Sequence, residues 1–374
     1  MFSSRIIGFC LVIILFFSLF TGASAQTVTP KIDSIATSSK YKNSFLLAPL
    51  ISNTPETAWA FALAGVYIFK TNKKDSTLRT STLPMGVAYT TRNQLLAAFG
   101  GTVFFPGEKY ILKMENTYSQ FPDRFWGLGN NTADNGYENY SFTQFFINPH
   151  VFRKIYKGYF GGLGWEYQQV LELNYAQGGY FDDDNVTGRR PYKMSNLGIL
   201  LNYDTRNHAY VPNKGELLNF EFYSSNELFG SDFKFQYVEI ELKKFIELHP
   251  GHVLGLHHLS LLSFGDVPFR SLGALGGNSI MRGYYTGRFR DKLMAAVQTE
   301  YRFPIYWRFG GVAFAGVGQV AKEFYDFKAE RLKYSIGTGL RFALLKQEKL
   351  NVRFDVAWGN HGSFNYYVIL AESF

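Results

Sequence analysis

The residues with the best spacing for specific chemistry lie in a glycine-rich stretch around Arg282. Five glycines within fifteen residues permit close backbone approach and positive φ angles, at positions Gly273, Gly276, Gly277, Gly283 and Gly287. Such a stretch suits packing into a confined space, where an arginine needs a carboxylate. Glu300 follows on the polar face of the next strand, and a bidentate pair with Arg282 would fix the stretch in place. The alternative interpretation is a solvated arginine and a glutamate that faces water.

Catalytic and metal-binding patterns are weak elsewhere. The seven histidines form no HExxH pair, and no GxSxG nucleophile motif occurs. Asp182–Asn185 lacks the alternating ligands of an EF-hand loop, and we interpret it as an acidic surface loop. Ser363 beside His361 is a pairing that chance produces in a chain of this length. The sequence therefore predicts no enzyme, no metal site and no cofactor.

Composition excludes further classes of protein. Aromatic residues make up 18% of the 374 residues and charged residues only 18%, which is incompatible with intrinsic disorder. The formal charge of +8 is spread along the chain without a Lys/Arg run longer than a pair, so no nucleic-acid partner is expected. The single cysteine, Cys10, lies in a predicted leader, and no disulfide is expected.

The first 43 residues divide into a leader and a tail. Residues 1–25 place a short apolar core between Arg5 and the small residues Ala23-Ser24-Ala25, which is typical of a secretory signal peptide. Residues 26–43 are polar and aperiodic, and we expect a short periplasmic tail, because so few residues cannot form a folded domain. No later stretch reaches the ~18 apolar residues of a membrane helix. A mature chain that meets a membrane would therefore do so through strands.

The rest of the chain alternates apolar and polar side chains, which predicts β-strands. In 350–359, every second residue is apolar, and Phe354 and Trp358 share that face. Arg353 and Asp355 lie on the other face. A soluble sandwich would bury the apolar face, whereas a membrane barrel points it at lipid and its polar face at the lumen.

The last stretch, 364–374, has an apolar face that ends at Phe374, with Glu372 as its one exception. Counted along the chain, the alternating stretches give sixteen candidate strands: 45–52, 57–69, 79–91, 94–105, 108–120, 138–153, 157–173, 194–204, 215–226, 232–247, 252–265, 291–304, 308–319, 332–344, 350–360 and 364–374.

Length and strand number favour the membrane barrel. Residues 44–374 are more than a single sandwich needs, and an even number of strands near ten residues fits a closed bacterial barrel. The sequence therefore predicts an all-β fold, a 16-stranded antiparallel transmembrane β-barrel over 44–374. The gaps 121–137, 174–193 and 266–290 would be extracellular loops.

The gap between the eleventh and twelfth candidate strands resembles the Omp85 superfamily. Arg282, Gly283 and Tyr284 match the Arg-Gly-Phe/Tyr motif at the tip of the family's sixth extracellular loop. In the family this loop folds back into a 16-stranded barrel. The resemblance implies an inward-folded loop between strands eleven and twelve, with Glu300 as a lumenal partner.

Two further stretches support the resemblance. Tyr203-Asp-Thr-Arg206, followed by Pro212 and Gly215, is similar to the family's Asp-x-Arg, Pro and Gly hairpin. A last strand that ends in Phe374 is similar to the signal that outer-membrane chains present to the assembly machinery.

The chain departs from the family pattern twice. Gly316 stands where family members usually carry an aspartate that is the second acceptor of the loop arginine. Asp355 could replace it, or Glu300 holds Arg282 alone, and a looser plug is expected. Family members also commonly carry periplasmic POTRA domains before the barrel, and residues 26–43 cannot encode one.

The first strand contains Pro49, which lacks the N–H that a β-ladder needs. In a closed barrel this strand seals against the last one. From this proline, and from the lateral gate that the resemblance implies, we expect an under-bonded seam between 45–51 and 364–374. Pro49 and Phe374 would lie on its two sides. The alternative is that Pro49 marks a bulge near the rim.

These features predict a non-enzymatic barrel in the outer membrane of a diderm bacterium. The expected function is to assist insertion or translocation of envelope proteins, or of lipids, through the weak seam. The expected partners are outer-membrane lipid, client outer-membrane proteins, and a periplasmic or membrane protein that supplies the missing POTRA role. The alternative is a passive pore or structural barrel plugged by the 266–290 loop.

Overall fold

The computed structural model describes seven stretches of the chain, namely residues 43–75, 78–134, 136–182, 186–208, 211–345, 350–370 and 372–374. The predicted signal peptide lies outside these residues, as does the predicted tail apart from Asn43. Asp183, Asp184 and Asn185 of the acidic stretch also lie outside them.

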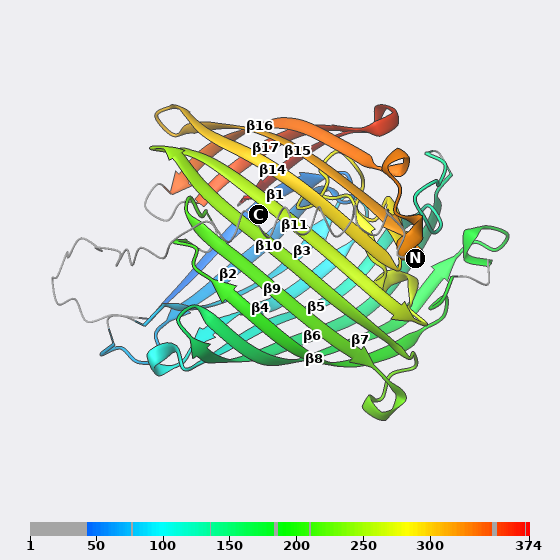
Figure 1. Ribbon diagram of the computed structural model, residues 1–374, viewed down its shortest axis with the longest axis horizontal. Helices are drawn as coiled ribbons and strands as arrows, with labels where there is room; N and C mark the ends of the chain where they lie inside the picture. The colour runs from blue at the N-terminus through cyan, green and yellow to red at the C-terminus, as the bar shows by residue number, and fades with distance from the viewer. Residues whose placement is uncertain are drawn as a thin grey trace, which may run out of the picture.

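Sixteen antiparallel strands close into a barrel, which confirms the predicted fold class (Figure 1). Each strand pairs with its neighbours in chain order, except that β11 pairs directly with β14. The barrel strands are β1 (Ser44–Thr54), β2 (Ala58–Phe69), β3 (Ser81–Thr90), β4 (Leu95–Phe104), β5 (Tyr110–Phe125), β6 (Glu138–Tyr156), β7 (Tyr159–Tyr175), β8 (Tyr192–Asp204), β9 (Gly215–Ser225), β10 (Phe235–His249), β11 (His252–Gly265), β14 (Leu293–Tyr306), β15 (Phe309–Ala321), β16 (Lys333–Leu345), β17 (Leu350–Gly359) and β18 (Phe364–Leu370).

The remaining elements are short. β12 (Gly273–Leu275) and β13 (Phe289–Asp291) form a separate two-stranded sheet. Single 3-10 turns occur at Pro106–Glu108, Tyr180–Asp182, Glu227–Phe229, Phe269–Ser271, Phe324–Asp326, Ala329–Arg331 and Asn360–Gly362. None of the helices in the described residues has the length and apolar character needed to cross a membrane.

The two faces of the strands have the polarity that the alternation predicts. In β17, Phe354 and Trp358 are 44% and 46% exposed, whereas Arg353 and Asp355 are 2% and 0% exposed. Apolar side chains therefore cover the outside, and charged side chains line the inside. This arrangement is the reverse of a soluble protein and is typical of barrels that face lipid.

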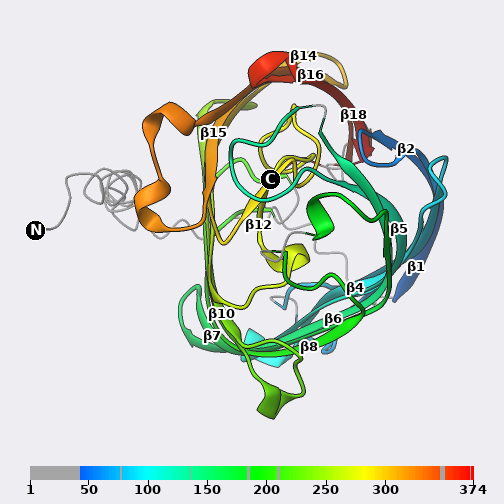
Figure 2. The ribbon, with the colours of Figure 1, turned by 90° about the vertical axis from the view of Figure 1, so that its right-hand side faces the viewer.

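The interior is not an open channel. Figure 2, which looks into the barrel, shows β12 and the C-terminus inside the ring of strands. The segment between β11 and β14 buries Phe269, Leu275 and Arg282. Several predicted strand ends are shifted, most of all that of β5, which continues to Phe125 where a loop was expected from residue 121. Its last residues stay in the sheet since they pack against this inward segment.

Candidate functional site

The loop between β11 and β14 enters the lumen as a short hairpin. β12 and β13 pair antiparallel, with Gly273 opposite Asp291. At the loop tip, Gly283 has a φ of +111°, and a Cβ there would lie 2.9 Å from the carbonyl carbon of Trp358 in β17. Only glycine combines this φ with so close an approach. The tip is therefore pressed against the backbone of the barrel wall.

Arg282, next to this glycine, is held by two carboxylates. Its Nη1 donates to Asp355 Oδ2 in β17 at 2.7 Å, and its Nη2 donates to Glu300 Oε2 in β14. The guanidinium carbon lies 3.4 Å from the centroid of the Phe314 ring. Arg282 is 1% exposed, and both carboxylates are fully buried. Charge-assisted hydrogen bonds of this kind fix both position and orientation.

The two carboxylates also bind arginines of the barrel wall. Arg302 Nε donates to Glu300 Oε1 at 2.8 Å, and Arg341 Nη1 donates to Asp355 Oδ1 at 2.5 Å. Arg353 approaches Asp355 at 3.7 Å. Neither carboxylate depends on the loop arginine alone. The loop therefore completes a network that belongs mainly to β14, β16 and β17.

Gly316 in β15 is the position at which the resemblance implied an aspartate. A Cβ at Gly316 would lie 3.0 Å from Sδ of Met281, so the loop itself occupies that space. Asp355 supplies the second carboxylate from β17 instead. The contacts of Arg282 are thus not those of the loosely held plug that we expected from Gly316.

Tyr284 anchors the loop tip on β16 and β17. Its hydroxyl donates to the carbonyl oxygen of Tyr334 at 2.8 Å and accepts from the backbone N–H of Asn360 at 2.6 Å. The side chain is 1% exposed. The motif Arg282, Gly283 and Tyr284 therefore touches the wall with all three of its residues.

We expect Tyr284→Phe to lower the free energy of unfolding by about 1–3 kcal/mol, because the buried hydroxyl that serves both the Tyr334 carbonyl and the Asn360 N–H is removed. Equilibrium unfolding in urea would measure the change. Tyr325→Phe is the control, since Tyr325 is 71% exposed and its hydroxyl makes no described hydrogen bond that the substitution would remove. Equal stability of the two variants would contradict the anchoring role.

The loop also contacts both sides of the seam between β1 and β18. The N–H of Gly283 donates to the Tyr367 hydroxyl at 3.0 Å, and its carbonyl accepts from Asn365 Nδ2 at 2.7 Å, both in β18. Three residues on, the N–H and hydroxyl of Thr286 donate to Glu56 Oε1 at 2.7 and 2.8 Å. Glu56 lies in the turn between β1 and β2. The loop therefore bridges the seam at that end.

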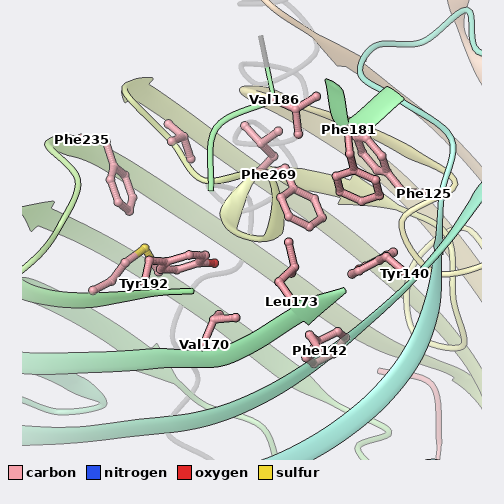
Figure 3. Close-up of a cluster of buried hydrophobic side chains, with 13 residues drawn as sticks. Phe125, Tyr140, Phe142, Val170, Leu173, Phe181, Val186, Tyr192, Phe235 and Phe269 are labelled. Carbon is pink, nitrogen blue, oxygen red and sulfur yellow. The ribbon is translucent and has the colours of Figure 1, made fainter. Parts of the chain in front are cut away.

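The opposite wall holds the loop through aromatic packing (Figure 3). The Phe269 ring lies 5.3 Å from Phe125 and 5.5 Å from Tyr140, measured between centroids. The Tyr285 hydroxyl donates to Asp123 Oδ1 of β5 at 2.9 Å. Burial, and next the Asp123 carboxylate, raise the pKa of Tyr285, so its phenol stays a proton donor at neutral pH. The loop thus crosses the lumen and is fixed at both walls.

Phe374 is not where the sequence pattern placed it. β18 ends at Leu370, and Phe374 lies in the lumen with 8% of its surface exposed. Its ring centroid is 4.9 Å from that of His257, and its carbonyl oxygen accepts from Arg302 Nη2 at 2.7 Å. The prediction of a lipid-facing Phe374 at the seam is therefore wrong. In the lumen, Arg302 and Arg341 donate hydrogen bonds to this segment. The edge of β1 is a poorer partner, because Pro49 has no N–H to donate.

The two residues before Phe374 bind the same network and the loop. Arg341 Nε donates to Glu372 Oε2 at 2.8 Å, and Ser373 Oγ donates to the carbonyl oxygen of Asn278 at 3.0 Å. Asn278 belongs to the inward loop. The C-terminal segment Glu372–Phe374 is therefore tied both to the wall and to the loop.

The seam itself is weakly paired. β1 and β2 are in register over all eleven residues of β1, including Pro49 opposite Leu63. Across the seam, the described residues contain one registered pair, Asn53 with Val368. The β1–β2 register shows no shift at Pro49, which removes the alternative of a bulge there. The first six residues of β1 are all exposed, as expected for an edge without a partner.

Sequence reasoning missed part of this site. It did not single out Arg302, Arg341 or Glu372, although Glu372 was the charged exception on the apolar face of the last stretch, and that signal could have revealed the inward turn. Ser363 donates to the Gly283 carbonyl at 2.6 Å and so has a structural contact, while the side chain of His361 lies outside the described ones. Within the described part of the chain, no group of three or more His, Cys, Asp and Glu residues is placed to hold a metal ion.

Three solved structures share the fold of this chain. "BamA from Haemophilus ducreyi lacking POTRA domains 1-3" is 12% identical with a TM-score of 0.59, covering 88% of this chain and 70% of that one. CdiB from Acinetobacter baumannii is 13% identical with a TM-score of 0.57, covering 89% of this chain and 60% of that one. CdiB from Escherichia coli is 9% identical with a TM-score of 0.58, covering 89% and 68%. At these identities, the likeness concerns the fold.

Sequence comparison adds the family. No curated protein matches the chain. The profile of the Omp85 superfamily domain matches residues 104–362, which include the loop motif and the two carboxylates that bind Arg282, Glu300 and Asp355. This chain therefore belongs to the Omp85 superfamily.

Proposed function

We propose that this chain is a non-enzymatic outer-membrane barrel that assists the insertion or translocation of envelope proteins, or of lipids. Membership of the family supports a role of this class, and the apolar outer surface supports a lipid environment. The observation that carries the proposal is the seam, where the described residues of β1 and β18 share a single registered pair.

The open part of the β1 edge is what a client would use. Ser44–Leu50 have registered partners in β2 but none among the described residues of β18. In hydrocarbon, each unsatisfied backbone group costs several kcal/mol, so such an edge favours pairing with an incoming strand. A client strand can add to this edge of β1 by β-augmentation. The backbone groups of the client strand that face β1 are then already hydrogen-bonded when the strand enters the bilayer.

The two ends of the seam differ in how firmly they are held. Gly283 and Thr286 hold β18 and the β1–β2 turn together at one end. At the other end, Glu372–Phe374 turn into the lumen and leave the beginning of β1 without a neighbour across the seam. The seam would thus open from the end where β1 begins while the loop keeps the barrel closed at the other.

Clients need delivery, and the described residues form the barrel and its loops without a separate receiving domain. A periplasmic or membrane partner that presents unfolded clients would supply this step. An open passive pore is less well supported, because the loop and the C-terminal segment occupy the lumen. A plugged structural barrel is the alternative that reconstitution tests.

Reconstitution tests the proposal. Liposomes that contain the purified barrel should fold a urea-denatured outer-membrane barrel several-fold faster than empty liposomes, measured by its electrophoretic shift without heating. Depletion in the source bacterium should lower the abundance of other outer-membrane proteins in a proteome measurement. No acceleration together with an unaltered proteome would contradict the proposal and favour the structural barrel.

A further inference from the structure

The lumenal face of β1 to β4 carries apolar side chains, whereas that of β14, β16 and β17 carries buried charged ones. Strand register aligns the lumenal residues of β1 to β4 in rows that run across the sheet. Two successive rows are Ala48, Ala64, Gly86 and Ala98, and Leu50, Ala62, Ala88 and Leu96. The alternate residues Phe61, Leu63 and Val87 are 54%, 49% and 47% exposed on the outside. Both faces of these strands are therefore apolar.

This lumenal face is also hollow. A concavity of about 600 Å³ is lined by the small residues of β2 to β4 together with larger residues of β5. The apolar clusters that hold the loop lie against β5 to β8, β10, β14 and β15 and include no residue of β2 to β4. Concave apolar surfaces of this size are typical of sites for apolar ligands.

The surroundings favour an acyl chain over a polypeptide. β2, β3 and β4 are each paired on both sides, so their backbones have no ladder to offer an incoming strand. A polypeptide on this face would keep its own backbone groups unsatisfied, whereas an acyl chain has none. The rows begin at β1, where Leu46 is 56% exposed beside the weakly paired seam. The apolar surface therefore continues from the outside of the barrel into the lumen.

The far end of the concavity is charged. Lys113 and Glu115 of β5 both border it. Neither makes an ion pair with the described residues, and Lys113 Nζ lies 5.0 Å above the Phe152 ring. An ammonium and a carboxylate side by side match a headgroup that carries both a phosphate and an amine. From β1 to β5 the wall spans four strand spacings, about 19 Å, which accommodates an acyl chain that reaches across half of a ~30 Å hydrocarbon core.

We propose that this lumenal face is a phospholipid site that takes phosphatidylethanolamine through the seam. The acyl chain lies on the alanine and glycine rows, the phosphate meets Lys113, and the amine meets Glu115. The inference rests on the proposed lipid environment and extends the proposed function, since the bound lipid would occupy the lumen beside the edge that clients use.

Native mass spectrometry of the purified barrel, titrated with phosphatidylethanolamine in detergent, tests the site. The unaltered protein should retain one lipid. Ala98→Phe places a phenyl ring in the path of the acyl chain and should lower the retained fraction at least tenfold at the same lipid concentration. Ala97→Phe is the matched control. Ala97 pairs with the outward-facing Val87, so this substitution adds the same volume on the outside of the barrel. Lys113→Gln combined with Glu115→Gln should abolish the preference for phosphatidylethanolamine over phosphatidylglycerol.

Three results would overturn the site: no lipid retained by the unaltered protein, equal retention by Ala98→Phe and Ala97→Phe, or a co-purified polypeptide in the concavity in place of lipid. The electrophoretic shift without heating shows whether each variant is folded. Because no client is present, lipid retention is independent of the insertion assay. A barrel that inserts clients but retains no lipid would overturn this inference alone, and the reverse result would overturn only the proposed function.

Discussion

Replacing Glu300 with glutamine is expected to release the loop from the wall and to lower the free energy of unfolding by about 3–5 kcal/mol, as when one partner of a buried ion pair is removed. Glu300 is fully buried and accepts hydrogen bonds from both Arg282 and Arg302. The neutral amide of the glutamine removes one of the negative charges that compensate the buried guanidinium groups of Arg282 and Arg302. Asp355 still binds Arg282, so we expect a loosened loop in a barrel that still closes.

Urea unfolding, trypsin cleavage within the loop and conductance in planar bilayers measure this prediction. Cleavage and conductance should both rise in Glu300→Gln. Glu172→Gln is the control, because it removes the same charge from an exposed glutamate of β7 that makes no described ion pair. Unchanged stability, cleavage and conductance in Glu300→Gln would show that the network does not hold the loop. Large, steady currents from the unaltered protein would instead favour the open pore.

The second large effect is expected from closing the seam covalently. Cysteines at Asn53 and Val368 would face one another at the registered pair between β1 and β18. Directly opposed residues in an antiparallel pair have Cα atoms about 4.5–5.5 Å apart, within the range that a disulfide bridges. The chain's one native cysteine, Cys10, is replaced by serine in all variants. Oxidation should abolish client insertion, and reduction should restore it.

The insertion assay in liposomes, run with and without reductant, measures this effect. The control joins Ser52 and Ala60 by cysteines, a registered pair within the continuous β1–β2 ladder. Its disulfide should leave insertion unchanged, because that ladder does not need to open. Full activity of the oxidised Asn53–Val368 variant would remove the seam as the working part. Equal loss in both variants would indicate a general effect of cross-linking β1.

The predicted strands agree with the structure because their signal is local. Every second residue of β17 faces outward, so Phe354 and Asp355 could be assigned to opposite faces without knowing any other strand. The same parity placed Glu300 in the lumen before its partner was known. Glu372 broke the pattern, and it is the residue that turns inward to bind Arg341.

The amino-acid sequence by itself determined the strands, their two faces, the even closure of the barrel and the glycine-rich loop with its arginine. Only the tertiary structure decided that Arg282 binds Asp355 as well as Glu300, that Phe374 lies in the lumen, and that the seam keeps one registered pair. The physical reason is range. Alternation acts between neighbouring residues, whereas ion pairs and strand edges join residues that only barrel closure brings together.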